Sequence, residues 1–417
     1  MSADGTAPVA LDKDFVRAQF PAFSQPALAD WVFMENAGGS YPAQATIDRL
    51  TGFYTRCKMQ PYGAAAPQAE AGRLMDEGRE RLAAYMNVAP EEVLVGPSTT
   101  QNVYVLAKAM AEILGPGDEI VVTDQDHEAN SGAWRKLAER GVTVREWTVA
   151  PDTGHLDPAA LAELLSERTR LVAFPQASNI VAELNPVAEI CAMARAAGAW
   201  TVVDGVSGAP HGLPDAEALG ADVYMFSTYK TYGPHQGVMV VRRAFNEAMP
   251  NQGHAFNNGY AEKRLVPAGP DHAQIAALAG MMDYFDALHA HHFGGEAVAP
   301  AERGRRLHAM MRAEEMRLTE RLLAYTERRQ ELRLMGPRDP SVRASTVALA
   351  HGTRSGPELA EAMAAHGIVA GGSNFYAPRV IEAMSEREAH GVLRLSFLHY
   401  TTEAEIDRTI AALEAVL

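Results

Sequence analysis

The stretch Phe226-Ser227-Thr228-Tyr229-Lys230-Thr231-Tyr232-Gly233-Pro234-His235 follows an apolar run and leads into a Gly-Pro turn. Another apolar run, Val202-Val203-Asp204, ends in an acid. Both patterns are typical of buried strands whose ends carry a polar side chain. We therefore predict an α/β domain in which Lys230 and Asp204 lie at neighbouring strand ends, where open α/β sheets bind their ligands.

The residue types at these two strand ends indicate one kind of chemistry. A lysine in apolar surroundings can lose its proton and form a Schiff base, and an aspartate can hold a pyridinium nitrogen. Together they predict a pyridoxal-phosphate site. Taken singly, each residue has a plainer interpretation, because a lysine in a Gly/Pro turn is usually solvated and an aspartate at a strand end usually caps the next turn.

Around these two strands, short apolar runs alternate with segments of helical periodicity from about residue 93 to residue 242, which is the pattern of βαβ units. Apolar or β-branched runs predict strands at residues 93–95, 119–123, 142–147, 171–175, 200–204, 223–227 and 237–242. Amphipathic segments at 161–165 and 187–197 predict helices between them. We expect an α/β fold whose large domain contains a mostly parallel, seven-stranded sheet.

The remainder of the chain predicts a second, smaller α+β domain. Helical patterns at 274–291 and 301–325 flank Gly294-Gly295, and apolar runs at 332–335, 345–349 and 392–397 accompany helices at 357–366 and after Thr402. A chain of 417 residues exceeds the size at which one core keeps growing. We predict an N-terminal arm at 1–25 that packs on the small domain, a large cofactor-binding domain at 26–290 and a small C-terminal domain at 291–417.

Composition narrows the partners and the compartment. The chain has 37 Lys and Arg against 52 Asp and Glu, a formal charge of -15, which disfavours nucleic acid and anionic membranes. The two cysteines, Cys57 and Cys191, are too few for a disulfide framework and lack the spacing of a metal site, so no metal is expected. Residues 1–6 do not resemble a signal peptide, and no apolar run has membrane-spanning length. A cytoplasmic location is expected.

Hydroxyl side chains gather where a predicted strand gives way to a helix. In Gly96-Pro97-Ser98-Thr99-Thr100-Gln101-Asn102, the hydroxyls of Thr99 and Thr100 meet free backbone N–H groups at the start of a helix predicted at 103–113. This arrangement predicts a phosphate site, to which Ser227 adds a hydroxyl from another strand end. The alternative for this segment alone is an ordinary Ser/Thr cap without a ligand.

Two further polar residues follow predicted strands. His127, in Asp124-Gln125-Asp126-His127, comes after the strand at 119–123, and a flat imidazole there can stack on an aromatic cofactor and shuttle protons. Asn179 comes after the strand at 171–175 and can donate an amide hydrogen to a ring hydroxyl; it is also a candidate for substrate binding. The plainer alternatives are a surface histidine among acids and a turn asparagine.

Candidates for substrate binding lie towards both ends of the chain. Arg394 interrupts the apolar strand Val392-Leu393-Arg394-Leu395-Ser396-Phe397. A guanidinium there needs a partner, and either a substrate carboxylate in a bidentate fork or a structural salt bridge can supply it. The stretch Met34-Glu35-Asn36-Ala37-Gly38-Gly39 either brings its backbone close to a ligand, with Asn36 as a second candidate, or forms a simple glycine-rich turn.

The order of these motifs resembles the class V aminotransferases of the aspartate-aminotransferase fold, in the branch that includes cysteine desulfurases, selenocysteine lyases and isopenicillin N epimerase. The resemblance covers most of the chain. It is carried by Glu35-Asn36-Ala37-Gly38-Gly39, Asp126-His127-Glu128-Ala129-Asn130, Ala177-Ser178-Asn179, Asp204-Gly205-Val206, Ala209-Pro210-His211, Ser227-Thr228-Tyr229-Lys230 and Arg394. It is closest to the cysteine desulfurase-like subgroup, where a Tyr-Lys-x-x-Gly-Pro-His stretch recurs.

The resemblance implies the pyridoxal-phosphate-dependent transferase fold of type I and a role for each motif. Lys230 would carry the Schiff base, Asp204 would pair with the pyridine nitrogen and His127 would stack on the ring. The other implied contacts are the phosphate with Thr99, Thr100 and Ser227, the ring oxygen with Asn179, the cofactor with Ser207, and the substrate α-carboxylate with Arg394. Because family members are homodimers with sites at the subunit interface, a homodimer is expected.

Departures from the family pattern bear on the reaction. Cysteine desulfurases carry a loop with a nucleophilic cysteine where this chain has Ala370-Gly371-Gly372-Ser373-Asn374-Phe375-Tyr376-Ala377-Pro378. Persulfide formation therefore lacks its acceptor unless Cys57 reaches the site, and a buried small hydrophobe is the plainer role for Cys57. Gly269-Pro270 stands where the family often has Gly-Thr, whose threonine contacts the partner's phosphate. Ser207 and Tyr229 stand where desulfurases commonly have Gln and His.

These features together predict a pyridoxal-phosphate enzyme that acts on a small amino acid through a Schiff base at Lys230. The expected reaction is amino-group transfer or β-elimination, depending on where the proton of Cα returns. The alternatives are cysteine desulfurase or selenocysteine lyase activity, and epimerisation. A protein that binds the cofactor or an amino acid without turnover is the alternative from another class.

Overall fold

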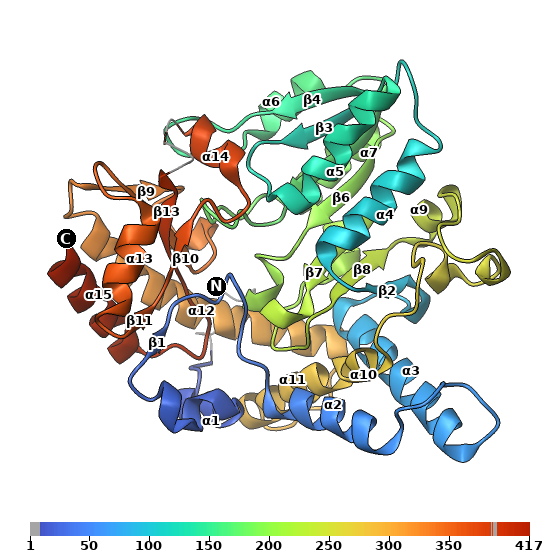
Figure 1. The fold of residues 1–417 in the computed structure, drawn as a ribbon, viewed down its shortest axis with the longest axis horizontal. Helices are drawn as coiled ribbons and strands as arrows, with labels where there is room; N and C mark the ends of the chain where they lie inside the picture. Colours follow the sequence, from blue (N-terminus) through green and yellow to red (C-terminus); the bar gives the residue numbers. More distant parts are fainter. Residues whose placement is uncertain (1–8, 385, 387–389) are drawn as a thin grey trace.

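Three β-sheets organise the chain in a computed structural model that describes residues 9–384, 386 and 390–417 (Figure 1). The largest has seven strands in the order β2-β8-β7-β6-β5-β3-β4. Its strands are β2 (Val93–Gly96), β3 (Glu119–Thr123), β4 (Thr143–Trp147), β5 (Thr169–Pro175), β6 (Trp200–Asp204), β7 (Val223–Ser227) and β8 (Gly237–Val241). β8 is antiparallel to both β2 and β7, and the remaining neighbours are parallel. The predicted α/β class with a mostly parallel seven-stranded sheet is confirmed.

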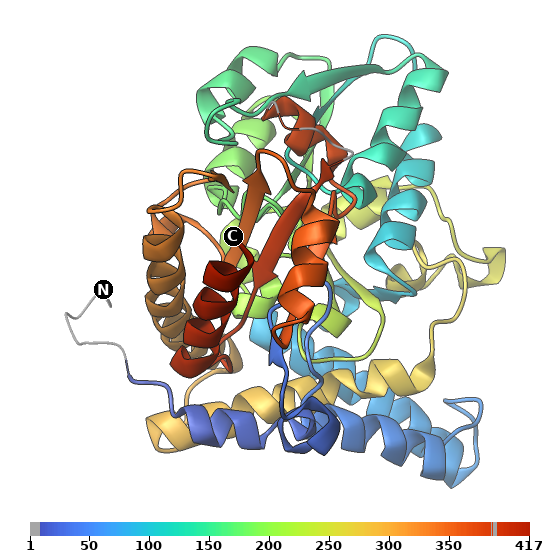
Figure 2. The same ribbon diagram turned by 60° about the vertical axis from the view of Figure 1, so that its left-hand side comes forward.

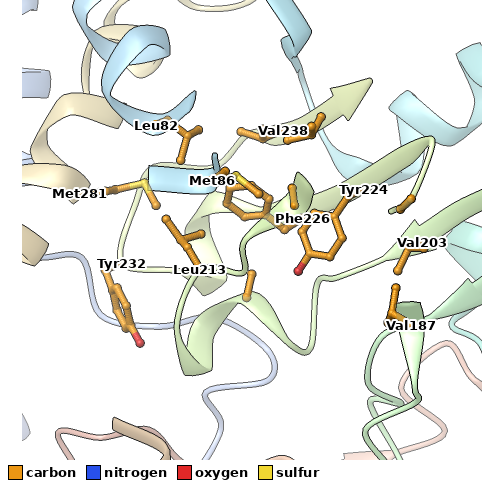
Figure 3. Packing of buried hydrophobic residues seen from close by; sticks show 14 of the residues in the cluster. Leu82, Met86, Val187, Val203, Leu213, Tyr224, Phe226, Tyr232, Val238 and Met281 are labelled. Atoms are coloured by element: carbon orange, nitrogen blue, oxygen red, sulfur yellow. The ribbon is translucent and has the colours of Figure 1, made fainter. Parts of the chain in front are cut away.

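Helices cover both faces of this sheet, because successive strand side chains point to opposite faces and both sets are apolar. In β7, Tyr224 and Phe226 pack into one core, and Val223 and Met225 pack into another. The first core includes residues of α3 (Ala66–Met86), α7 (Val187–Ala196) and α11 (Leu278–Phe293), and the second includes residues of α4 (Thr99–Ala111), α5 (Gly132–Arg135) and α9 (Arg243–Ala248). Figure 3 shows part of the first core, where strand side chains meet those of α3 and α11.

The helix predicted at 274–291 is divided in the structure. α10 (His272–Ala276) and α11 are separated at Ala277. α11 then passes close to the start of α2 (Gln44–Arg56), since a Cβ at Gly280 would lie 2.6 Å from the backbone oxygen of Ala45. The large domain also contains α6 (Pro158–Leu164) and α8 (Ala216–Leu219). Among the described residues, no helix is both long and apolar enough to cross a membrane.

A four-stranded antiparallel sheet forms the centre of the C-terminal lobe. Its order is β12-β13-β10-β9, with β9 (Leu332–Met335), β10 (Thr346–His351), β12 (Gly371–Ser373) and β13 (Val392–Ser396). The helices of this lobe are α12 (Pro300–Thr326), α13 (Gly356–Ala364), α14 (Pro378–Ala383) and α15 (Glu403–Val416). This arrangement confirms the predicted smaller α+β domain, and α15 begins at the predicted cap Thr402.

Residues near the N-terminus join the C-terminal lobe. β1 (Val32–Phe33) pairs in parallel with β11 (Ile368–Val369), and this pair forms the third sheet. The predicted large domain of 26–290 includes β1, although the strand partner of β1 belongs to the other lobe. The predicted limit after residue 290 falls inside α11. The exact domain limits remain predictions.

The N-terminal segment lies along α11 and the C-terminal lobe, as Figure 2 shows for α1 (Lys13–Ala18). The Nζ of Lys13 donates to the backbone oxygen of Thr401 at 2.7 Å, and Arg17 forms an ion pair with Glu405 at 2.9 Å. The ring of Phe15 stacks on that of His291 in α11 at 3.8 Å between centroids. Residues 1–8 of the predicted arm lie outside the described residues.

The sheet directs several chain segments to one edge. β3 pairs with β5, β5 with β6 and β6 with β7, each in parallel. The carboxyl ends of these four strands therefore lie side by side at one edge. The N-terminus of α4 reaches the same edge across Gly237, where an added Cβ would lie 2.4 Å from backbone atoms of Ser98 and Thr99. Glycine at 237 therefore sets how closely α4 approaches β8.

Replacing Gly237 tests this close approach. We expect Gly237→Ala to lower the free energy of unfolding by about 1–3 kcal/mol, because the added methyl group meets backbone that cannot rotate away. The matched control is Gly352→Ala, since a Cβ at exposed Gly352 meets no heavy atom within 4 Å. Chemical denaturation followed by circular dichroism measures both changes, and equal effects of the two substitutions would contradict the packing argument.

Candidate active site

Polar side chains from several elements meet in one cavity of about 180 Å³ at the carboxyl edge of the large sheet. Its lining consists of Ser98, Thr99, Thr100, Asp126, His127, Ala129, Pro175, Ala177, Asn179, Asp204, Val206, Ser207, Ser227, Tyr229, Lys230 and His235. Every residue predicted to bind the cofactor is in this set. The structure therefore brings together strand ends that are far apart in the sequence.

Lys230 ends the short turn at 228–230 that follows β7. Burial lowers the pKa of its amine to about 8, and the positive charge of Arg394 acts in the same direction. The carboxylates of Asp204 and Glu35 oppose this shift. An amine with this pKa is neutral, and so nucleophilic, in a far larger fraction of molecules near physiological pH than an ordinary lysine amine is.

Two buried acids share the cavity. Asp204 ends β6, and its Oδ1 accepts a hydrogen bond from the backbone N–H of Val206 at 2.8 Å. Burial raises the pKa of Asp204 to about 6, and the charge of Lys230 opposes this shift. Burial raises the pKa of Asp126 well above its usual range, with the charge of Asp204 as a further cause. Because two neighbouring buried carboxyls do not ionise together, we infer that Asp126 holds the proton.

Asp126 was not among the residues predicted for the site. The Nδ2 of Asn130 donates to its Oδ2 at 2.7 Å, and the Nε1 of Trp134 donates to the Oδ1 of Asn130 at 3.1 Å. The Oδ1 of Asp126 and the Oδ1 of Asn179 are buried without a hydrogen-bond partner. Such atoms in a polar cavity are places where a ligand can bind. The signal in the sequence was an acid directly beside His127, three residues beyond the end of β3.

His127 presents a neutral ring to the cavity. Burial lowers the pKa of His127 to about 3, and the charges of Lys230 and Arg394 lower it further. The Nδ1 accepts a hydrogen bond from the backbone N–H of Ala129 at 3.0 Å. This contact assigns the proton of the neutral ring to Nε2 and fixes the ring orientation.

Of the residues predicted to bind a phosphate, Thr99 and Thr100 lie at the N-terminus of α4 and Ser227 lies at the end of β7. The Oγ of Ser98 caps the helix by accepting from the backbone N–H of Gln101 at 3.2 Å. Thr99 and Thr100 are therefore not needed as the cap, and both line the cavity. The Oγ1 of Thr99 lies 2.8 Å from the Oγ of Ser227. Hydroxyls beside a helix N-terminus favour an anion.

Arg394, in β13, has the structural salt bridge that was one of its two predicted roles. Its Nη2 donates to the Oε1 of Glu35 at 2.6 Å, and its Nη1 donates to the backbone oxygen of Asn179 at 3.3 Å. The pairing has room because Gly371, opposite Arg394 in the β12–β13 ladder, has no side chain; a Cβ there would lie 2.3 Å from the Oε2 of Glu35. The Nε of Arg394 is buried without a partner. Arg394 is itself buried and is not in the cavity lining, so the structure shows the salt bridge and leaves the substrate-binding role a prediction.

The substrate-binding role predicted for Asn36 does not fit its surroundings. Asn36 is buried and is not in the cavity lining. Its Nδ2 donates to the backbone oxygen of Ser396 at 3.1 Å, and its Oδ1 accepts from the hydroxyl of Tyr400. The amide thus fastens the segment after β1 to the C-terminal lobe, a role that a local sequence pattern does not reveal.

Neither cysteine lines the cavity. Cys57 follows α2 and Cys191 lies in α7, and both are buried and unpaired. Burial raises the pKa of the Cys191 thiol to about 11, which disfavours the reactive thiolate. Within the described parts of the chain, no group of three or more His, Cys, Asp or Glu side chains is placed to hold a metal ion.

Comparison with known proteins yields the same family as the motifs. The family model described as Aminotransferase class-V matches residues 32–291 and 303–409. An aminotransferase-like protein of Gibberella zeae is 31% identical over 414 residues, covering 96% of this chain and 98% of that protein. A cysteine desulfurase of Serratia proteamaculans is 30% identical over 419 residues, covering 96% of this chain and 97% of that protein.

Solved structures share the fold. The cysteine desulfurase of Thermococcus onnurineus has a TM-score of 0.84 at 21% identity, with 99% of each chain covered. The cysteine desulfurase CsdA of Escherichia coli has a TM-score of 0.80 at 22% identity, with 98% of each chain covered. These likenesses confirm the predicted fold of the pyridoxal-phosphate-dependent transferases.

The lowered pKa of Lys230 predicts a specific reactivity. We expect acylation of its Nζ in cofactor-free protein to rise as the pH passes about 8, because only the neutral amine attacks. An ordinary lysine amine, with a pKa of about 10.4, becomes neutral and reactive only at a higher pH. Labelling across a pH series with mass spectrometry of the peptides measures this. Lys108, whose side chain is 70% exposed, is the reference, and identical profiles for the two lysines would contradict the lowered pKa.

Proposed function

The chain belongs to the class V aminotransferase family, and from that premise we propose that it binds pyridoxal 5'-phosphate through Lys230 and acts at the Cα of an amino acid. Membership makes it an enzyme of the pyridoxal-phosphate-dependent kind. The proposal rests on one observation, which is that a single cavity combines a lysine of pKa about 8 with Asp204, His127 and the N-terminus of α4.

The residues of the cavity fit this cofactor. The cavity holds two buried oxygens without partners, the Oδ1 of Asp126 and the Oδ1 of Asn179, and the Asn179 oxygen can accept from a ring hydroxyl. Asp204 would bind the pyridine nitrogen, and its position between a backbone N–H and the Lys230 charge keeps it the more acidic of the two buried acids. Thr99, Thr100 and Ser227 would bind the phosphate with the backbone N–H groups of α4.

The remaining residues would orient the bound molecules. The flat, neutral ring of His127 would lie against the cofactor ring. Asn179, whose Nδ2 also donates to the backbone oxygen of Phe375, would bind the ring oxygen, and Ser207 lines the same cavity. When bound, pyridoxal phosphate supplies an aldehyde and a conjugated ring that accepts electrons from Cα. Lys230 would hold the cofactor through Nζ and move the proton at the substrate Cα, while Arg394 would bind the α-carboxylate.

We propose amino-group transfer or loss of a β-substituent as the outcome, and not formation of a protein persulfide. Persulfide formation needs a thiolate at the site, and Cys57 and Cys191 are both buried away from the cavity lining. The segment at 370–378 contains no cysteine. A role in binding without turnover has less support, because a buried lysine of lowered pKa is useful mainly for reaction.

Covalent attachment of the cofactor tests the proposal directly. We expect the purified protein, mixed with pyridoxal phosphate and reduced with borohydride, to carry the cofactor on the peptide that contains Lys230. Lys230→Ala should abolish both the visible absorption of the mixture and the labelled peptide, since no other lysine lines the cavity. Lys136→Ala is the control, because Lys136 lies outside it. Label at other lysines only would contradict the proposal.

The products then identify the reaction. The loaded protein is given a panel of amino acids, and keto acid, ammonia and sulfide are measured together. Keto acid formed with a second keto acid as amino acceptor indicates transfer, and keto acid with ammonia indicates β-elimination. Sulfide released from cysteine, with a persulfide on the protein, would overturn the preference against desulfuration.

We also propose that the chain forms a homodimer in the cytoplasm and that the second copy covers an exposed aromatic surface. A cleft of about 770 Å³ is lined in part by Tyr62, Phe256, Tyr260 and Gly269-Pro270. Phe256 is 80% exposed, and large exposed aromatic surfaces commonly mark protein contacts. The unpaired cysteines support a reducing compartment.

Sedimentation equilibrium measures the proposed association. We expect a mass of twice 45.0 kDa for the unaltered protein and a shift towards one chain for Phe256→Glu, because the added charge would be buried at the contact. Tyr104→Glu, a change at another exposed aromatic residue, on α4 outside this cleft, is the control. A mass of 45.0 kDa for the unaltered protein would contradict the proposal.

A further inference from the structure

The segment between β12 and α14 holds two aromatic residues in an unusual backbone conformation. Phe375 and Tyr376 have φ values of 49° and 56°, a region that residues with a side chain rarely adopt. Two such residues in succession cost conformational energy, and surrounding contacts must hold them there. Strain of this kind concentrates at sites that bind ligands.

The contacts that hold this segment come from the rim of the cavity. The Nδ2 of Asn179 donates to the backbone oxygen of Phe375 at 2.9 Å, and the backbone N–H of Glu128 donates to the backbone oxygen of Tyr376 at 2.7 Å. Glu128 also forms an ion pair with Arg379. Because Asn179 lines the cavity and Glu128 is adjacent to His127, the segment is fastened to the loops that form the site.

Phe375 covers the proposed carboxylate-binding group. The Cζ of Arg394 lies 3.7 Å from the centroid of the Phe375 ring, a cation–π contact. Glu35 and the backbone oxygen of Asn179 occupy two other positions around the same guanidinium. A substrate whose carboxylate reaches Arg394 therefore lies beside the ring of Phe375.

Tyr376 lies at the other end of the segment, beside His127. The two ring centroids are 5.6 Å apart with an angle of 46° between the planes. Tyr376 is nevertheless 74% exposed, while the Oδ1 of Asn374 accepts from its backbone N–H at 3.1 Å. The chain thus fixes the backbone of an aromatic residue and leaves its ring in solvent, next to the cavity.

We propose that Phe375 and Tyr376 determine the side-chain selectivity of the enzyme and favour an amino acid with an apolar, ring-bearing side chain over one with a small side chain. This inference rests on the proposed function, in which Lys230 receives the amine and Arg394 the carboxylate. The two aromatic residues span from Arg394 to His127, so they border the side chain of a substrate held at these groups. Covering the exposed ring of Tyr376 with an apolar group removes apolar surface from water.

Two carboxylates that lack an amino group test the selectivity without turnover. The probes are 3-phenylpropanoate and propanoate, and titration calorimetry on the protein loaded with pyridoxal phosphate measures each dissociation constant. We expect 3-phenylpropanoate to bind about tenfold more tightly than propanoate. Tyr376→Ala should reduce this ratio about fivefold, and Phe375→Leu, which keeps an apolar side chain against Arg394, should also reduce it.

Tyr104→Ala is the matched control, since Tyr104 is 46% exposed and lies on α4 outside the cavity lining, and it should leave the ratio unchanged. Circular dichroism of each variant verifies the fold. An unchanged ratio in both Tyr376→Ala and Phe375→Leu, in protein that carries the cofactor on Lys230, would overturn this inference alone. Absence of cofactor on Lys230 would overturn the proposed function and this inference with it.

Discussion

Desolvation of ionisable groups at the carboxyl edge of the large sheet is the constraint on which the site depends. Burial is the largest cause of the pKa shift of four groups here, and each shift favours the neutral form. It lowers the pKa of Lys230 and His127 and raises the pKa of Asp204 and Asp126. The same burial would be unfavourable in an ordinary core, because polar groups there need partners. It is tolerated here since the groups face one another and a cavity able to hold a polar ligand.

The rest of the architecture maintains this edge. A sheet buried on both faces keeps the strand ends rigid, and Gly237 lets α4 approach closely enough for its N-terminus to join the same cavity. The C-terminal lobe contributes Arg394, whose salt bridge with Glu35 joins residues 359 positions apart in the chain. The positive charge of Arg394 also lowers the pKa of Lys230 and of His127, so the charges of the two lobes act on one another across the boundary.

Local patterns were sufficient to predict the strands of the large sheet, because strands covered on both faces are continuous apolar runs and their polar ends are conspicuous. These polar strand ends meet at one edge of the sheet, so the cavity contains the predicted Lys230, Asp204, His127 and Asn179. Contacts between distant segments were not predictable. The raised pKa of Asp126 depends on its burial and on the charge of Asp204, and the hydrogen bonds of Asn36 to Ser396 and Tyr400 depend on how the segment after β1 meets β13. Neither arrangement leaves a periodic signal in the sequence.

The pairing of β1 with β11 has a consequence for the order in which the molecule is completed. Val32 and Phe33 leave the ribosome early, but their strand partners Ile368 and Val369 emerge near the end of synthesis. The early segment must therefore wait without its partner while the intervening domain forms, and closing so long a loop carries an entropic cost. A fragment that begins after the large domain would keep an unpaired strand edge at β11, and such edges promote association between chains.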